Sequence, residues 1–188
     1  MASSSDERKL VTELRAGSRK AFEELLDTYQ DKVYGLAYHM VGPAEAEDVA
    51  QDALIEVCRS VGGFRGDSSL ATWIHRVAAN VCLEHRRKRK SVTVELDDDL
   101  LDPATDAQTD PSRAAELSEI KGSVDEAISR LSDVHRDVVV LHELQGLTYA
   151  ECANALGVPV GTVKSRLSNA FVKLRELLKN CAEGEVAI

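Results

Sequence analysis

The strongest constraint on this chain is the segment 147–178, in which apolar side chains recur at α-helical spacing on both sides of a short break. Gly157 is expected to end the first helix in a left-handed conformation, which Gly adopts freely. Pro159 is expected to open the second helix, where its missing N–H costs nothing. The segment therefore predicts two helices joined by a tight turn. In DNA-binding proteins, the second helix of such a helix-turn-helix enters the major groove.

The surfaces of the two helices support this interpretation. Thr148 and Glu151 have the spacing of a capping box at the start of the first helix. The second helix carries an apolar stripe, which consists of Val163, Leu167, Ala170, Phe171, Leu174 and Leu178. Its polar and basic residues lie largely off that stripe, namely Thr162, Lys164, Ser165, Arg166, Ser168, Asn169 and Lys173. An ordinary helical hairpin with a solvated face would look similar, so the pattern alone favours DNA binding only by about two to one.

Helical periodicity dominates the rest of the chain, so an all-α fold is expected. We place one small helical domain at 1–90 and a second at 113–180, followed by a short tail at 181–188. Between them, 91–112 carries acids and prolines without periodicity, which is typical of an exposed, flexible linker. Within the domains, helices are expected at about 6–16, from Ser18 to 41, and at about 44–61, 69–90, 113–131 and 133–144, the last capped by Ser132.

Three segments together resemble bacterial sigma factors of the sigma-70 family, and most closely the extracytoplasmic-function (ECF) group. GVPVGTVKSRL with the NAFVKLRELL helix is similar to their minus-thirty-five reading domain, called region 4. The other two segments are similar to parts of a second sigma-factor domain, called region 2. The segment at 46–61, AEDVAQDALIEVCRSV, is similar to the part that binds the polymerase clamp. The segment at 64–90, FRGDSSLATWIHRVAANVCLEHRRKRK, is similar to the part that reads the minus-ten element. The resemblance covers about 160 of the 188 residues in the family's order and spacing. It implies a factor that binds core RNA polymerase, recognises promoter DNA and helps to melt it.

The distribution of charge agrees with DNA binding, although the net charge of −9 at first argues against it. Eight basic and two acidic residues occupy 59–90, and five basic and one acidic occupy 160–180. Seven acidic residues and no Lys or Arg occupy 95–110. Local basic patches bind phosphates even on an acidic protein. The overall acidity would also weaken binding to random DNA in the absence of polymerase.

The predicted helix at 44–61 has an acidic outer face, which an ordinary solvated surface would also explain. By resemblance, this face docks on the basic coiled-coil clamp of the large polymerase subunit, since charge complementarity favours that partner and excludes DNA. The expected contacts are Asp48, Gln51, Asp52 and Glu56.

The loop at 64–68 and the helix after it are implied to read and melt the minus-ten element, with no covalent chemistry. Such proteins offer pockets to unstacked bases and positive charge to the backbone. The implied residues are Phe64, Arg65, Asp67, Ser68, Trp73, Arg76, Asn80, Arg86, Arg87 and Lys88. Trp73 would equally suit a core position between helices, and we weigh that role slightly higher. The basic run at 86–90 would also suit a solvated helix end, although it exceeds what the helix dipole requires.

In region 4, the residues aligned with the base-reading positions of the family are Lys164, Ser165, Ser168 and Asn169. Asn favours adenine and Lys favours guanine. Relatives often carry Arg, His or an aromatic residue in place of Ser168 and Asn169, so the resemblance does not provide the promoter sequence. Thr162 and Arg166 are expected to hold phosphates, as is Tyr149, and Lys173 completes the basic face.

Two further expectations concern regulation. The acidic linker is either a solubilising tether or, by resemblance, a segment that threads the active-site cleft and RNA exit path of polymerase. Two small domains on a tether suit capture by a separate anti-sigma factor, which commonly holds family members inactive.

Other features of the sequence narrow the function further. Without an apolar N-terminal segment or a bilayer-length apolar run, we expect no secretion signal, no membrane span and a cytoplasmic location with reduced cysteines. Cys82 and His85 lack a second ligand pair, so we expect no metal, and no motif indicates a cofactor, a small-molecule substrate or an enzyme. A conventional DNA-binding regulator explains only the last domain. A mimic that titrates an anti-sigma factor would not need the basic run or the recognition helix.

Overall fold

The computed structural model of the protein describes residues 4–93 and 122–184, and within those ranges it contains helices and no strand. The first unit comprises α1 (Ser4–Arg15), α2 (Arg19–Val41), α3 (Ala46–Ser60), the short 3-10 turn η1 (Val61–Gly63) and α4 (Leu70–Thr93). Residues 122–129 are also helical. The second unit continues with α6 (Asp133–Val139), the π-helical turn η2 (Val140–Leu144), α7 (Tyr149–Leu156) and α8 (Val160–Gly184). The all-α expectation is confirmed for the described residues.

Glycines and one serine set the ends of the first helices, as the sequence predicts. Gly17 and Gly42 have φ angles of 75° and 93°, which favour Gly, and they follow the last turns of α1 and α2. The Ser18 hydroxyl caps α2 by accepting a hydrogen bond from the backbone N–H of Ala21 at 3.4 Å. These local signals lie in the turns themselves, which is why they can be read without knowledge of the packing.

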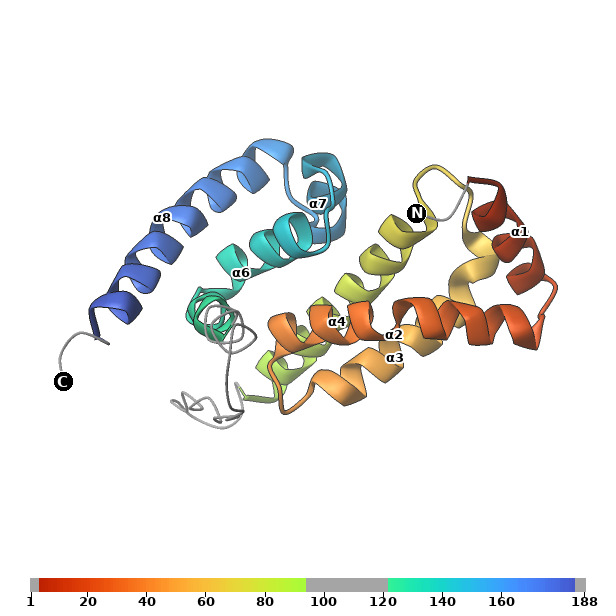
Figure 1. The fold of residues 1–188 in the computed structure, drawn as a ribbon, viewed down its shortest axis with the longest axis horizontal. Coiled ribbons are helices and arrows are strands. Elements are labelled where there is room, and N and C mark those ends of the chain that lie inside the picture. The colour runs from red at the N-terminus through yellow and green to blue at the C-terminus, as the bar shows by residue number, and fades with distance from the viewer. Residues whose placement is uncertain (1–3, 94–121, 185–188) are drawn as a thin grey trace, which may run out of the picture.

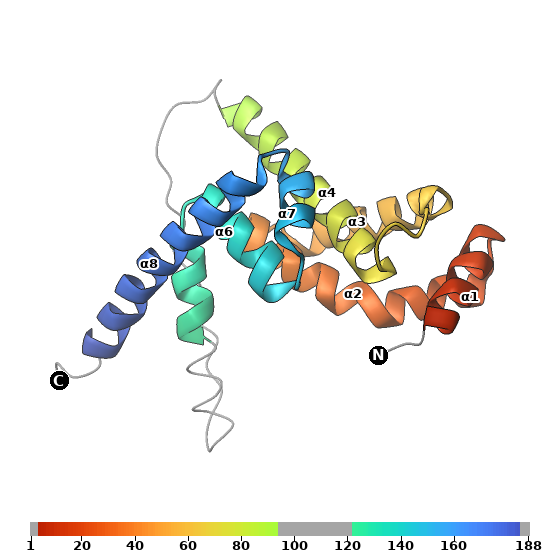
Figure 2. The same ribbon diagram turned by 90° about the horizontal axis from the view of Figure 1, so that it is seen from above.

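The first unit is a bundle in which α2, α3 and α4 pack against one another and α1 closes one end (Figure 1). Each helix buries small or aliphatic side chains, so the axes can approach closely. The buried set includes Leu25, Leu36, Met40, Val49, Ala53, Ile74 and Ala78. Figure 2 shows α2 and α4 running side by side beneath the second unit.

The second unit packs directly on the first. Helix α7 lies against α4, and α6 and η2 lie against α2, as both ribbon views show (Figures 1 and 2). One buried cluster extends through both units without interruption. The structure therefore places the two domains in contact.

Several expected boundaries need correction. Helix α4 extends to Thr93, so the first residues of the expected linker are helical. The predicted helix 133–144 changes to π geometry at Val140. Ser132 occupies the N-cap position, but its hydroxyl lies 2.9 Å from His135 Nδ1 and makes no capping bond. The remainder of the linker, 94–112, and residues 113–121 lie outside the described residues, as does the end of the tail.

Candidate nucleic-acid and polymerase interfaces

The predicted helix-turn-helix is present in α7 and α8. The Thr148 N–H donates to Glu151 Oε2 at 2.8 Å, and the Glu151 N–H donates to Thr148 Oγ1 at 3.3 Å, which completes the capping box. Gly157 ends α7 with φ 64° and ψ 35°, in the left-handed region. The N–H groups of Thr162 and Val163 donate to the Pro159 carbonyl, so α8 begins directly after the proline. The angle between the two helices thus follows from signals in the turn.

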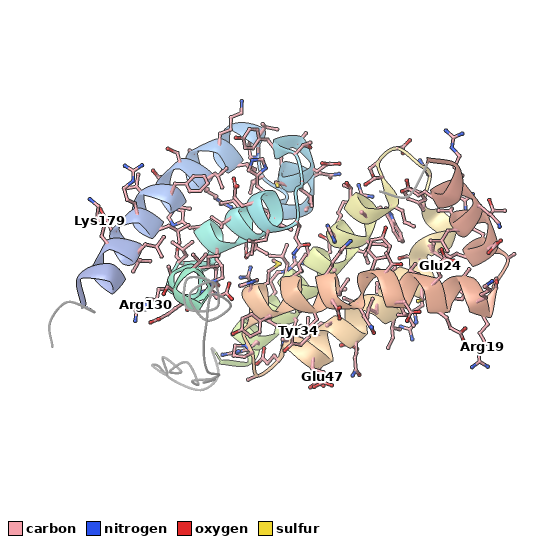
Figure 3. All side chains as sticks on the ribbon, viewed as in Figure 1. Arg19, Glu24, Tyr34, Glu47, Arg130 and Lys179 are labelled. Atoms are coloured by element: carbon pink, nitrogen blue, oxygen red, sulfur yellow. The ribbon has the colours of Figure 1, made fainter. Side chains whose placement is uncertain are left out.

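Helix α8 divides into a buried and an exposed side. Val163, Leu167 and Ala170 are 0%, 4% and 0% exposed. The side chains of Lys164, Ser165, Ser168, Asn169 and Lys173 are exposed, and those of Thr162 and Arg166 are half-buried. Phe171 was placed in the apolar stripe, but it is 45% exposed. At 3.6 residues per turn it lies about 80° around the helix from Val163, at the edge of the covered side. The last turns of α8 also extend beyond α7, where Lys179 projects outward (Figure 3).

The exposed side of α8 carries Lys164 and Lys173, and His135 of α6 lies near its edge. His135 on α6 has a lowered pKa, because it loses solvating water and because Lys173 and Arg166 lie near it. Lys173, Arg166 and His135 thus lie close together, and the two cations suit an anionic partner such as the DNA backbone. The sequence pattern did not single out His135, since η2 and the whole of α7 separate it from the recognition helix.

A groove of about 780 Å³ lies between α3 and α4, and it brings together residues from two separate predictions. Trp73, Arg76, Asn80 and Lys88 line it from α4, and Asp52 and Glu56 line it from α3. Asn80 is exposed and Arg76 is half-buried. Arg59 on the α3 wall and Glu84 on the α4 wall also line it, so both walls carry both signs of charge beside the amide of Asn80.

The loop at 64–68 is attached to α1 and to the start of α4. The Arg15 guanidinium donates to the Phe64 carbonyl, and the Leu70 N–H donates to the Glu7 carboxylate. Ser69 caps α4 by accepting from the Thr72 N–H at 3.1 Å. These anchors were not predicted, although Ser69 before an apolar run is a recognisable capping signal. They leave Arg65, Gly66 and Asp67 exposed, with Ser68 half-buried.

The acidic face of α3 is exposed as predicted. Asp48, Gln51, Asp52 and Glu56 recur at three- and four-residue spacing and all reach solvent. Glu47 also points away from the bundle (Figure 3). Beside this face lies a shallow apolar depression of about 330 Å³, lined by Leu26, Leu54, Ile55, Cys58 and Arg59. The sequence pattern did not lead us to predict this depression. Ile55 on the outer face of α3, which is 47% exposed, is the residue that could have indicated it. Partial burial raises the pKa of the Cys58 thiol.

The two halves of this arrangement match two known family models. Residues 25–92 match Sigma-70 region 2, and residues 121–174 match Sigma-70, region 4. The chain is 36% identical to RNA polymerase sigma-H factor of Pseudomonas aeruginosa, over 90% of this chain and 92% of that protein. It is 31% identical to ECF RNA polymerase sigma factor SigW of Bacillus subtilis, over 92% and 97%. The chain belongs to the ECF sigma factors of the sigma-70 family.

The fold agrees with that of a solved relative. The sigma factor RpoE of Bartonella quintana, in a co-crystal structure with the anti-sigma factor NepR, superposes with a TM-score of 0.69 at 26% identity. The superposition covers 85% of this chain and 98% of that one. As a sigma factor, the protein binds core RNA polymerase and directs initiation at particular promoters. None of its described helices is long and apolar enough to cross a membrane.

Two aromatic residues of the minus-ten prediction need correction in this sigma factor. Phe64 is 6% exposed and Trp73 is 7% exposed, with their ring centroids 5.6 Å apart. Their rings pack on each other between α4 and the loop, so neither offers an open face to an unstacked base in this structure. The core role weighed for Trp73 is confirmed, although part of the residue borders the groove.

Arg86 is engaged within the protein in this arrangement. It was expected to bind phosphate, but its side chain is only 15% exposed and its Nη2 lies 2.6 Å from Asp137 Oδ2 on α6. Asp133 Oδ1 lies 3.8 Å from Nη1, and the Met40 carbonyl accepts from Nη1 at 3.3 Å. Burial raises the pKa of Asp137 despite the guanidinium beside it. Arg86 therefore joins the two domains, whereas Arg87 and Lys88 of the same run remain exposed.

Proposed function

We propose that this sigma factor uses three surfaces: the acidic face of α3 for the polymerase clamp, the α3–α4 groove for the minus-ten element, and the outer side of α8 for the minus-thirty-five element. The first two share Asp52 and Glu56. The observation that supports this most directly is the exposure of all three surfaces on one chain. The first and the third also have the charge that suits their partners, acidic on α3 and basic on α8. The protein would act through binding and DNA melting, without covalent chemistry, in the cytoplasm.

In the minus-ten groove, Asn80 is the residue best placed to read a base. Its amide is exposed on the groove wall one helical turn from Arg76, which provides positive charge for the backbone. Flipping a base out of the stack costs a few kcal/mol, and hydrogen bonds to the base edge offset part of that cost. Binding of an extruded base at Asn80 would therefore favour open DNA.

Run-off transcription with purified core polymerase tests this function. Initiation at specific promoters is expected to depend on the sigma factor. Asn80→Ala is expected to reduce initiation from duplex promoters about tenfold, since a base-edge contact is worth roughly 1–3 kcal/mol. A template already unpaired at the minus-ten element should recover much of that loss. Initiation without the sigma factor, or an equal loss on both templates, would contradict the proposal.

Minus-thirty-five reading divides between base contacts and phosphate contacts. Asn169→Ala is expected to reduce discrimination at one adenine by about 1–3 kcal/mol. Arg166→Ala is expected to weaken binding to all promoters alike and to lower the salt dependence by about one charge. Affinities of the polymerase holoenzyme for a promoter set at several salt concentrations distinguish the two effects. If Arg166→Ala changed base preference and Asn169→Ala did not, Arg166 would be the base contact and Asn169 would not, which would contradict this proposal.

Separation of the domains is part of the proposed mechanism. Promoter elements centred near positions −35 and −10 lie about 25 base pairs apart, roughly 85 Å along B-DNA. A compact chain of 188 residues has a radius of gyration of only about 16 Å. The packed arrangement of Figure 1 therefore represents a resting form, and the domains must part before both elements are read. The solved relative bound to NepR supports control of this chain by an anti-sigma factor as well.

A further inference from the structure

One side chain expected to read bases does not extend freely into solvent. Lys164 Nζ lies over the ring of Tyr149, 5.5 Å from the ring centroid. Tyr149 is the first residue of α7, and the residue is 38% exposed. A cation at this distance from an aromatic face is attracted by the ring quadrupole. The contact therefore restricts a long side chain that would otherwise sample many rotamers.

The tyrosine ring is itself held in place. His142 stacks on it, with ring centroids 4.5 Å apart and an interplanar angle of 25°. His142 Nδ1 lies 2.6 Å from the carbonyl oxygen of Leu147, so the imidazole N–H donates to that carbonyl. Leu147 is 1% exposed, which ties this carbonyl to the core. The stack thus runs from the core through His142 and Tyr149 to Lys164.

The π-helical turn explains how His142 reaches this position. A π turn inserts an additional residue into a helix and so rotates the residues that follow. His142 lies within η2, between α6 and the loop that leads to α7. The local departure from α-helical geometry therefore occurs where a side chain has to support the first helix of the helix-turn-helix.

We infer that Tyr149, supported by His142, is a positioning residue that orients Lys164 for reading a base of the minus-thirty-five element. This inference rests on the proposed role of α8. It replaces the expected phosphate contact of Tyr149 with a role for the ring rather than the hydroxyl. A preorganised lysine loses less conformational freedom on binding, and it presents its charge to one position of the groove instead of to the nearest phosphate.

The test measures base preference rather than total affinity. Holoenzyme containing the full chain is titrated with its best minus-thirty-five sequence and with all single-base substitutions of it. Lys164→Ala first identifies the position that Lys164 reads. Tyr149→Leu is expected to reduce discrimination at that position two- to fivefold, the range for an exposed cation–π contact. It should have no further effect in the Lys164→Ala background. Tyr149→Phe, which keeps the ring, should restore the discrimination.

A second variant tests the inference independently, in case Tyr149→Leu does not fold. His142→Ala leaves Tyr149, Lys164 and the rest of α8 in place, and it is expected to lower discrimination at the same position. Equal, sequence-independent weakening by Tyr149→Phe and Tyr149→Leu would show a hydroxyl–phosphate contact and overturn the inference. Unchanged discrimination in both Tyr149→Leu and His142→Ala would overturn it as well. If the unmodified protein showed no base preference, the proposed role of α8 would itself be wrong.

Discussion

Replacing Asp48 and Asp52 together by Arg is expected to abolish binding of the sigma factor to core RNA polymerase, a loss of about 4 kcal/mol or more. The two carboxylates lie four residues apart on the exposed face of α3. Charge reversal would place two cations against a basic clamp, and like charges across an interface cost several kcal/mol. Neither side chain contributes to the core, so the fold should tolerate the change.

Binding of fluorescent sigma factor to purified core polymerase measures this effect. A matched control is Asp27→Arg with Asp31→Arg, which makes the same charge change at the same spacing on the exposed side of α2. That control is expected to bind nearly as well as the unmodified protein. Retained affinity in the α3 variant would place the clamp interface elsewhere. An equal loss in both variants would indicate an effect of net charge rather than a docking site.

Asp137→Ala is expected to open the contact between the two domains. The carboxylate is 7% exposed and forms the shortest ion pair of Arg86, at 2.6 Å. Without Asp137, the buried Arg86 keeps the more distant Asp133 carboxylate, at 3.8 Å, as its ion-pair partner. Breaking a buried pair costs up to about 3–5 kcal/mol. Separation of the domains would relieve this cost, because Arg86 would regain water. The prediction is a larger mean distance between labels on α2 and α8 and stronger binding of the sigma factor to non-specific DNA.

Distances between the labels, measured by energy transfer, test this prediction. Arg86→Ala combined with Asp137→Ala removes both charges, so it is expected to be closer to the unmodified protein than Asp137→Ala alone. Glu84→Ala is the control, because it breaks the exposed 2.9 Å pair with Lys88 on the same helix. Such exposed pairs contribute about 1 kcal/mol or less. If Asp137→Ala left the distance unchanged, the ion pair would not hold the domains together.

The packed arrangement of the two domains determines which binding surfaces are available first. The acidic face of α3 and the outer side of α8 both remain exposed, so polymerase can bind α3 before the domains part. Arg86 becomes available to DNA only after they separate. The clamp surface would then be available first and Arg86 last, whereas Arg87 and Lys88 are exposed from the start.

The sequence by itself was sufficient for the features that depend on neighbouring residues. Ser18, Thr148 with Glu151, and Gly157 all act within one helical turn, so their conformations follow from local hydrogen bonds and from φ preference. The division of α8 into two sides follows likewise from its period, except at Phe171, where the exposed fraction depends on which helix covers it. The acidic face of α3 was predictable for the same reason.

Only the tertiary structure decided the features that join distant residues. Arg86 belongs to a basic run in sequence, yet its carboxylate partners lie about fifty residues later. Whether it meets phosphate or carboxylate depends on domain packing. Phe64 and Trp73 are buried because their rings pack on each other. Tyr149 stacks on His142 and Lys164 lies over Tyr149 because η2, α7 and α8 meet in the folded chain. Periodicity reports which face of a helix is apolar, but it does not report what lies against that face.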